Sequence, residues 1–475
     1  MSAALPLPSI WRGRSFPIKK SGRLREDRLW IDAAIGVFSI FYAIGTGPYL
    51  VVPADVFFHL GEIQKAVQLL DSGSVPDLSP WYVVLGIALH LSKDSFDSFL
   101  IFFPILTTFL FLLSIRVFSS YIAKQSGALR RHESVFVLLS VLLSLLFFGT
   151  SVFSFVRYYA FAPVALTLPI FFLILPLFLT RRGEHWAVTS SAFNLTTISA
   201  VCATLWFFHK QESLFILLTG ATFVCFATWS ILLAPKSFLK SFRISVSSSN
   251  WVGFVLFFNA GSWIFYAFFP LEVAQVVRDN TIPITLSGFG VSEFVIGDPL
   301  GRSFETMGLV GYSAIAIYLL PPLRNLRSPT VLALIATPLM TVFNPIFASL
   351  FSTFTLPSVL WRLFYMVPIG VLLASIVVGL VYLSYSRVLK YGSGAILLLT
   401  ASFPLPGMTF FQYRVESLQA TPRFNSPEIW GDLIHEVREL GRVNVLTVPV
   451  TGYVLSALSK AEHSLNIFCP TEFGD

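Results

Sequence analysis

Three residues early in the chain combine the side-chain types that acid–base or metal chemistry needs. Asp55, His59 and Glu62 follow one another at spacings of four and three residues within PADVFFHLGEIQKAVQLLDSG, residues 53–73. On a helix these spacings place the three side chains near one face. A carboxylate there can accept a proton, and the three together could hold a divalent ion such as Mg²⁺ or Mn²⁺. The simpler interpretation is a surface helix with Asp55 as its N-cap and a solvated polar face.

Further charged residues occur where apolar segments end. They are Arg157, the turn residues His209, Lys210 and Glu212, and Arg362. Each has a structural explanation, because an arginine can reach the membrane interface with its charged end and a polar turn can simply be solvated. Together they supply cations for a phosphate and a carboxylate for a proton, which is the set that a lipid-linked phosphate would require.

The composition indicates which class of protein must position these residues. Hydrophobic residues make up 55% of the 475 residues and charged residues 12%, against roughly 25% charged in a soluble domain. The mean hydropathy is +0.75. These values predict an all-α polytopic membrane protein, with membrane lipids as its surroundings. Three cysteines are too few for a disulfide framework.

About eleven stretches are long and apolar enough to be transmembrane helices, which need about 20 residues each. They are about 30–52, 97–120, 134–151, 161–180, 187–208, 213–235, 250–270, 306–323, 329–349, 360–384 and 393–410. With the N-terminus inside, the inner segments hold most of the 32 lysines and arginines, as the positive-inside rule requires. We therefore expect a multi-pass protein with N-in, C-out topology, located in the cytoplasmic (inner) membrane if the cell is prokaryotic. The net charge of +7 then reflects this sorting, and no nucleic-acid partner is expected.

This topology divides the chain into three regions. Residues 1–29 form a cytoplasmic basic arm, residues 30–410 a transmembrane domain, and residues 411–475 a small extracytoplasmic α/β region. The outer side carries a first loop at 53–96 and a long, Gly-rich loop at 271–305. In the first loop, two helices are expected to rest on the membrane surface. The first is amphipathic, and the second, at about 80–92, is too short to span. All the candidate residues fall on this outer side.

The segment ADVFFHLGEIQ, followed by turn residues Gly73, Pro76 and Asp77, resembles the first outer loop of GT-C class membrane glycosyltransferases. Its Asp-x-x-x-His pattern is most similar to oligosaccharyltransferase catalytic subunits and their bacterial relatives. The likeness at residue level is confined to this segment, and the WWDYG motif of oligosaccharyltransferases is absent from the sequence. Transfer to a protein asparagine is therefore not implied, and a monosaccharide transferase is favoured.

The resemblance implies an enzyme that moves a sugar from a polyprenyl- or dolichyl-phosphate donor to a glycan, lipid or protein acceptor on the outer face, with inversion. Asp55 takes the role of general base or metal ligand. The substrate-binding residues are then expected to be His59, Glu62, Arg157, His209, Lys210, Glu212 and Arg362. No cofactor is required by this scheme, and a divalent metal held by Asp55, His59 and Glu62 is an option within it.

Other classes stay open from the residues alone. A transporter or flippase for an amphiphile also uses intramembrane charges, although here the polar residues gather on one side rather than at the midplane. An O-antigen polymerase or ligase would use arginine-bearing outer loops such as 271–305. A non-catalytic assembly subunit is a third alternative. The enzyme interpretation gains if Asp55, the 209–212 turn and Arg362 meet in the folded chain.

Overall fold

The computed structural model describes residues 21–46, 54–74, 78–92, 96–147, 161–182, 185–233, 243–244, 248–268, 299–347, 357–382 and 387–402. This part of the chain is almost entirely α-helical, as expected. The α-helices are α1 (Ser21–Thr46), α2 (Ala54–Asp71), α3 (Pro80–Ser92), α4 (Phe96–Gln125), α5 (Glu133–Phe147), α7 (Val164–Ile174), α8 (Ala192–Phe208), α9 (Lys210–Leu233), α10 (Ser248–Phe268), α12 (Pro299–Tyr318), α13 (Pro329–Thr341), α15 (Ile369–Tyr382) and α16 (Arg387–Ser402). The 3-10 helices are η1 (Leu129–His132), η2 (Leu175–Leu177), η4 (Pro321–Leu326) and η5 (Pro357–Met366), and the strands are β1 (Leu179–Arg182), β2 (His185–Val188) and β3 (Arg243–Ile244).

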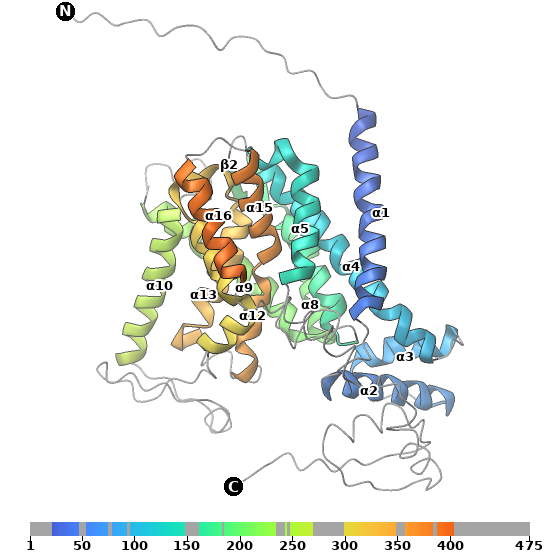
Figure 1. The fold of residues 1–475 in the computed structure, drawn as a ribbon. Coiled ribbons are helices and arrows are strands. Elements are labelled where there is room, and N and C mark those ends of the chain that lie inside the picture. The colour runs from blue at the N-terminus through green and yellow to red at the C-terminus, as the bar shows by residue number, and fades with distance from the viewer. Residues whose placement is uncertain are drawn as a thin grey trace, which may run out of the picture.

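The helices form a bundle, and two short helices lie across one of its ends. Helices α1, α5, α10, α15 and α16 run along a common direction, whereas α2 and α3 lie across it at the lower end in Figure 1. This is the pair of short helices expected in the first loop. Helix α3 occupies the predicted range. Helix α2 begins at Ala54, so Asp55 lies inside its first turn and not at the N-cap, where the simpler interpretation had placed it. The two helices pack closely, since a Cβ added to Gly86 of α3 would lie 2.6 Å from the Cβ of Ala66 in α2.

A small antiparallel sheet departs from the helical expectation. Strand β1 pairs with β2, and β2 with β3, with Leu179 opposite Val188. The predicted spans 161–180 and 187–208 are therefore wrong at their facing ends, because α7 stops at Ile174 and α8 starts only at Ala192. Backbone groups in this stretch are satisfied by strand pairing instead of helical hydrogen bonds. The sheet lies at the end of the bundle opposite α2 and α3 (Figure 1).

Among the described residues, two helical stretches are long enough to cross a membrane. Phe102–Gln125 and Lys210–Ser230 are both long and apolar enough to span a bilayer. A described helix overlaps each of the eleven predicted stretches, but several of these helices, such as α7 and α13, are shorter than a straight span needs. The basic arm up to residue 20, most of loop 271–305 and the α/β region at 411–475 lie outside the described residues.

Helices α5 and α15 pack against each other very closely in the core of the bundle. A Cβ added to Gly370 would lie 2.4 Å from both the backbone nitrogen and the Oγ of Ser144. A side chain at position 370 would therefore collide with backbone atoms that cannot rotate away. The surrounding core residues are large and fully buried, as Phe118, Phe172 and Phe364 illustrate.

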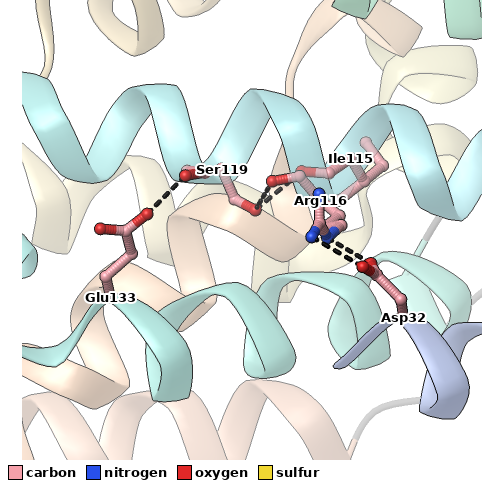
Figure 2. Close-up of polar contacts among 6 residues, drawn as sticks. Asp32, Ile115, Arg116, Ser119 and Glu133 are labelled. Atoms are coloured by element: carbon pink, nitrogen blue, oxygen red, sulfur yellow. Dashed lines mark hydrogen bonds and ion pairs between the residues drawn. The ribbon is translucent and has the colours of Figure 1, made fainter. Parts of the chain in front are cut away.

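Helix α1 is tied to the bundle by a charged pair. Figure 2 shows Arg116 of α4 facing Asp32 of α1, with Nε–Oδ1 and Nη2–Oδ2 distances of 2.6 and 2.9 Å. These two parallel contacts have the bidentate geometry that gives guanidinium–carboxylate pairs their strength. One turn farther along α4, Ser120 donates a hydrogen bond to Glu133 of α5. Polar contacts thus link α4 to α1 and to α5.

Candidate functional site

His59 lies between the two crossed helices. Its Nδ1 is 2.7 Å from the hydroxyl oxygen of Tyr82 in α3, and the two rings face each other at a centroid distance of 5.8 Å. Tyr82 is buried and His59 is partly buried. The hydrogen bond therefore fixes the imidazole on the side of α2 that faces α3.

A second polar cluster forms where α8 meets α9. His209 is the single residue between the two helices, and its Nδ1 contacts Oε2 of Glu212 in the first turn of α9. The same oxygen accepts a hydrogen bond of 2.8 Å from the hydroxyl of Thr167 in α7. The Glu212 side chain is fully buried, whereas that of His209 is 26% exposed. The imidazole is consequently the accessible end of a cluster whose carboxylate is enclosed.

His209 and Arg362 both act electrostatically on His59. Burial, followed by the positive charges of His209 and Arg362, lowers the pKa of His59 from 6.5 to about 4. Desolvation and a nearby cation both disfavour the imidazolium, so His59 is neutral at pH 7. His209 in the α8–α9 turn and Arg362 in η5 are therefore within electrostatic range of His59 on α2, although they lie far from it in the sequence.

A hydrogen bond from α3 helps to hold this arrangement. The indole N–H of Trp81 donates to the backbone oxygen of Phe161 at 2.9 Å, just before α7 begins. Trp81 and Phe161 are both buried. Because Thr167 lies less than two turns beyond Phe161 on the same segment, this bond fixes the crossed helices against the helix that contacts Glu212.

Arg362 belongs to η5, and the residues that follow it within this 3-10 helix enter the core. Its side chain is partly exposed, while Phe364 and Tyr365 are buried. These two aromatic residues, with Phe172, Ile369 and others, line a cavity of about 20 Å³, which is the room of about one water molecule. The cavity is too small for a lipid chain, so a lipid substrate would have to lie outside it.

Two other predicted residues, Lys210 and Glu62, share their helices with Glu212 and His59. Lys210 is exposed, and its ammonium is 5.7 Å from the ring centroid of Trp206. It is two positions from Glu212 on the helix, so the two side chains point to different sides. Glu62 is partly buried on α2, one turn from His59. The predicted substrate-binding roles of both residues stay predictions.

The side chains of the remaining candidates lie outside the described part of the chain. Asp55 lies in the first turn of α2, but its side chain is outside the described part, and Arg157 is outside it altogether. Among the described residues, no group of three or more His, Cys, Asp or Glu side chains could hold a metal ion. Because Asp55 was one of the three expected ligands, the metal site with His59 and Glu62 stays a prediction.

Two residues in contact with the site had not been expected there. Tyr82 looked like one aromatic residue in a short apolar helix, and Thr167 like one hydroxyl in an apolar run. Neither position carries a charge or a motif. Their roles depend on which helix packs against which, so only the folded chain reveals them.

Comparison with known proteins does not assign the chain to a family. No family model matches the chain, and no curated protein matches its sequence. The likeness to GT-C enzymes therefore continues to rest on the first-loop residues alone.

Proposed function

We propose that this chain is a multi-pass membrane protein whose bundle is surrounded by lipid. Large apolar side chains stand exposed on several helices, among them Trp30 of α1 (77%), Phe193 of α8 (76%) and Phe257 of α10 (64%). So many large, exposed apolar side chains are unusual on proteins surrounded by water. In a bilayer the same side chains lie in hydrocarbon at no cost, which agrees with the two helices of spanning length.

Within this membrane protein we propose a glycosyltransferase site on the outer face. The donor would be a sugar linked to polyprenyl or dolichyl phosphate, and the acceptor a hydroxyl group of a glycan, lipid or protein. The observation that supports the proposal is the electrostatic interaction of His59, on the first-loop helix α2, with both His209 and Arg362. A cation next to an enclosed polar cluster suits a phosphate held at the membrane boundary.

The proposed reaction is a single displacement with inversion. Asp55 removes the proton of the acceptor hydroxyl as its oxygen attacks the anomeric carbon. The bond between that carbon and the phosphate oxygen breaks at the same time, and the lipid phosphate leaves as an anion. Arg362 stabilises the charge that develops on the phosphate. A neutral His59 can donate or accept a hydrogen bond but adds no charge to the phosphate.

The role of Asp55 is tested by transfer assays on purified protein with labelled polyprenyl-phosphate sugars. Because a positioned general base contributes about 10²–10⁴-fold, we expect Asp55→Asn to lose at least about 100-fold in turnover while eluting and unfolding like the wild type. Lys65→Gln, an exposed change on the same helix, should keep full activity. Near wild-type transfer by Asp55→Asn contradicts the assignment, and donor that crosses the bilayer without sugar transfer supports a flippase instead.

Arg362 is tested through donor affinity. Removing a charged hydrogen-bond donor from a phosphate costs about 1.5–3 kcal/mol, so Arg362→Ala should raise the dissociation constant of the lipid-phosphate sugar by about 10- to 100-fold. Arg324→Ala is the matched control, since Arg324 is exposed on η4 and is predicted to face the other side of the membrane. Equal donor affinity in the wild type and Arg362→Ala excludes the phosphate role.

A further inference from the structure

The α8–α9 junction contains a carboxylate that is enclosed by its own chain. Glu212 has no exposed side-chain surface, and burying a carboxylate is costly unless hydrogen bonds replace its water. Here Oε2 contacts the hydroxyl of Thr167 and Nδ1 of His209, and Oε1 accepts from the amide of Gln211 at 3.4 Å. Glu212 is thus occupied by protein groups and has no surface to offer a substrate.

The contact with Glu212 decides how His209 is held. An ionised carboxylate only accepts hydrogen bonds, so Nδ1 of His209 must be the protonated nitrogen in this pair. The other nitrogen, Nε2, is then left for an external group. The backbone holds the ring in place as well, because the N–H of His209 donates to Leu205 at 2.7 Å and α9 starts at the next residue.

The surroundings of His209 distinguish it from the other imidazole of the site. Glu212 on α9 contacts the His209 ring, and Lys210 is the next residue along the chain. His59 on α2 interacts electrostatically with His209 and also with Arg362 on η5. His59 has Tyr82 as its partner instead, a neutral phenol. When His209 carries a second proton, Glu212 balances the charge and Nε2–H can donate to an anion.

We propose that Glu212 and Thr167 are positioning residues that hold His209 as a hydrogen-bond donor to the phosphate of the lipid-linked donor. This inference rests on the proposed function and assigns different roles within its site. His209 contacts the phosphate together with Arg362, while Glu212 and Thr167 act only through His209. As the leaving phosphate gains charge, the Nε2–H contact strengthens and so favours cleavage of the bond to the sugar.

Three variants separate positioning from a merely structural role. Glu212→Gln keeps the shape but removes the negative charge, and Thr167→Val removes the hydroxyl at nearly constant volume. We expect kcat/KM to fall about 10- to 100-fold in Glu212→Gln, as is typical when the partner of a working histidine is lost. We also expect the loss of activity at rising pH to begin at a lower pH, because the imidazolium is no longer balanced. Thr167→Ser should restore what Thr167→Val loses.

A second measurement needs no sugar transfer. Diethyl pyrocarbonate acylates the unprotonated nitrogen of histidine, and mass spectrometry of the intact, detergent-solubilised chain locates the label. In Glu212→Gln the acylation of His209 should begin at a lower pH than in the wild type, with His90 on α3 as the internal control. Adding undecaprenyl phosphate to the wild type should slow acylation at His209 and leave His90 unaffected. If Glu212→Gln does not fold, Thr167→Val takes its place in the same comparison.

The outcomes are separable. An unchanged acylation curve at His209 in a folded Glu212→Gln or Thr167→Val protein overturns the positioning role, and a lack of protection by undecaprenyl phosphate overturns the phosphate contact. Protection without any transfer of labelled sugar by the wild type supports this site as a lipid-phosphate site and counts against the glycosyltransferase itself.

Discussion

The two imidazoles of the site differ because their partners differ. His59 lies against a phenol, and burial, followed by the influence of His209 and Arg362, lowers its pKa to about 4. His209 lies against a buried carboxylate. In the sequence both are single histidines beside a glutamate three positions along, His59 with Glu62 and His209 with Glu212. Spacing alone therefore cannot distinguish a histidine that stays neutral at pH 7 from one whose positive charge a neighbouring carboxylate can balance.

The lowered pKa of His59 predicts how stability depends on pH. In the folded chain His59 takes up its proton only near pH 4, whereas in the unfolded chain it does so near 6.5. Between these values the unfolded chain binds more protons, so stability is full above about pH 6.5 and is lost as the pH falls toward 4. The loss from this one residue amounts to at most about 3 kcal/mol.

Thermal unfolding in detergent at pH 4.5–7.5 measures this contribution. His59→Gln should flatten the part of the pH dependence that His59 causes, while His132→Gln, a change outside the site, should not. Parallel curves for the wild type and His59→Gln would show that the pKa of His59 is not lowered.

At the scale of elements, the sequence predicted those helices and turns whose ends coincide with the ends of apolar runs. Helix α3 starts at a proline and ends with its apolar run, and it lies where it was predicted. The α8–α9 turn was expected as a tight turn at residues 209–212 and is one residue long. The hairpin of β1 and β2 was missed because four-residue strands between two apolar helices give no period that a hydropathy window can detect.

The contact between α5 and α15 carries a prediction at the same scale. Gly370→Ala would force a Cβ against backbone atoms of Ser144, so we expect a loss of about 1–3 kcal/mol, typical of overpacking. Gly253→Ala on α10 meets no atom within 4 Å and should be neutral, or stabilising by up to about 1 kcal/mol, because it removes only backbone freedom. Unfolding midpoints in one detergent compare the two, and equal midpoints would contradict the close contact.

For the whole molecule, the predicted topology places the crossed helices and the sheet on opposite sides of a membrane. In the structure, the sheet that contains Arg181, Arg182 and Arg243 lies at the far end of the bundle from α2 and α3. The N-in, C-out topology itself stays a prediction. The sequence could not predict how the helices pack, because the bundle faces that meet, such as Gly370 on Ser144, involve residues without charge or motif.

Sidedness is tested by cysteine labelling in a variant without native cysteines. Lys65→Cys on α2 and Arg130→Cys on η1 both replace exposed residues. A membrane-impermeant maleimide should label position 65 in intact cells and position 130 only after permeabilisation. Restoring Cys225, which is exposed on α9, should give no labelling in either case if lipid covers that face. Labelling of positions 65 and 130 from the same side contradicts the topology.

The one-residue link between α8 and α9 also limits how the length of this chain can change. His209 is both the whole connection and a member of the polar cluster, so no other loop residue could absorb a change of length. Inserting or deleting one residue there would turn α9 by about 100° about its axis relative to α8. That turn would carry Glu212 away from Thr167 and present an unpaired carboxylate to apolar neighbours. Substitutions at this junction can be tolerated one by one, whereas a change of length would break the cluster and the helix packing together.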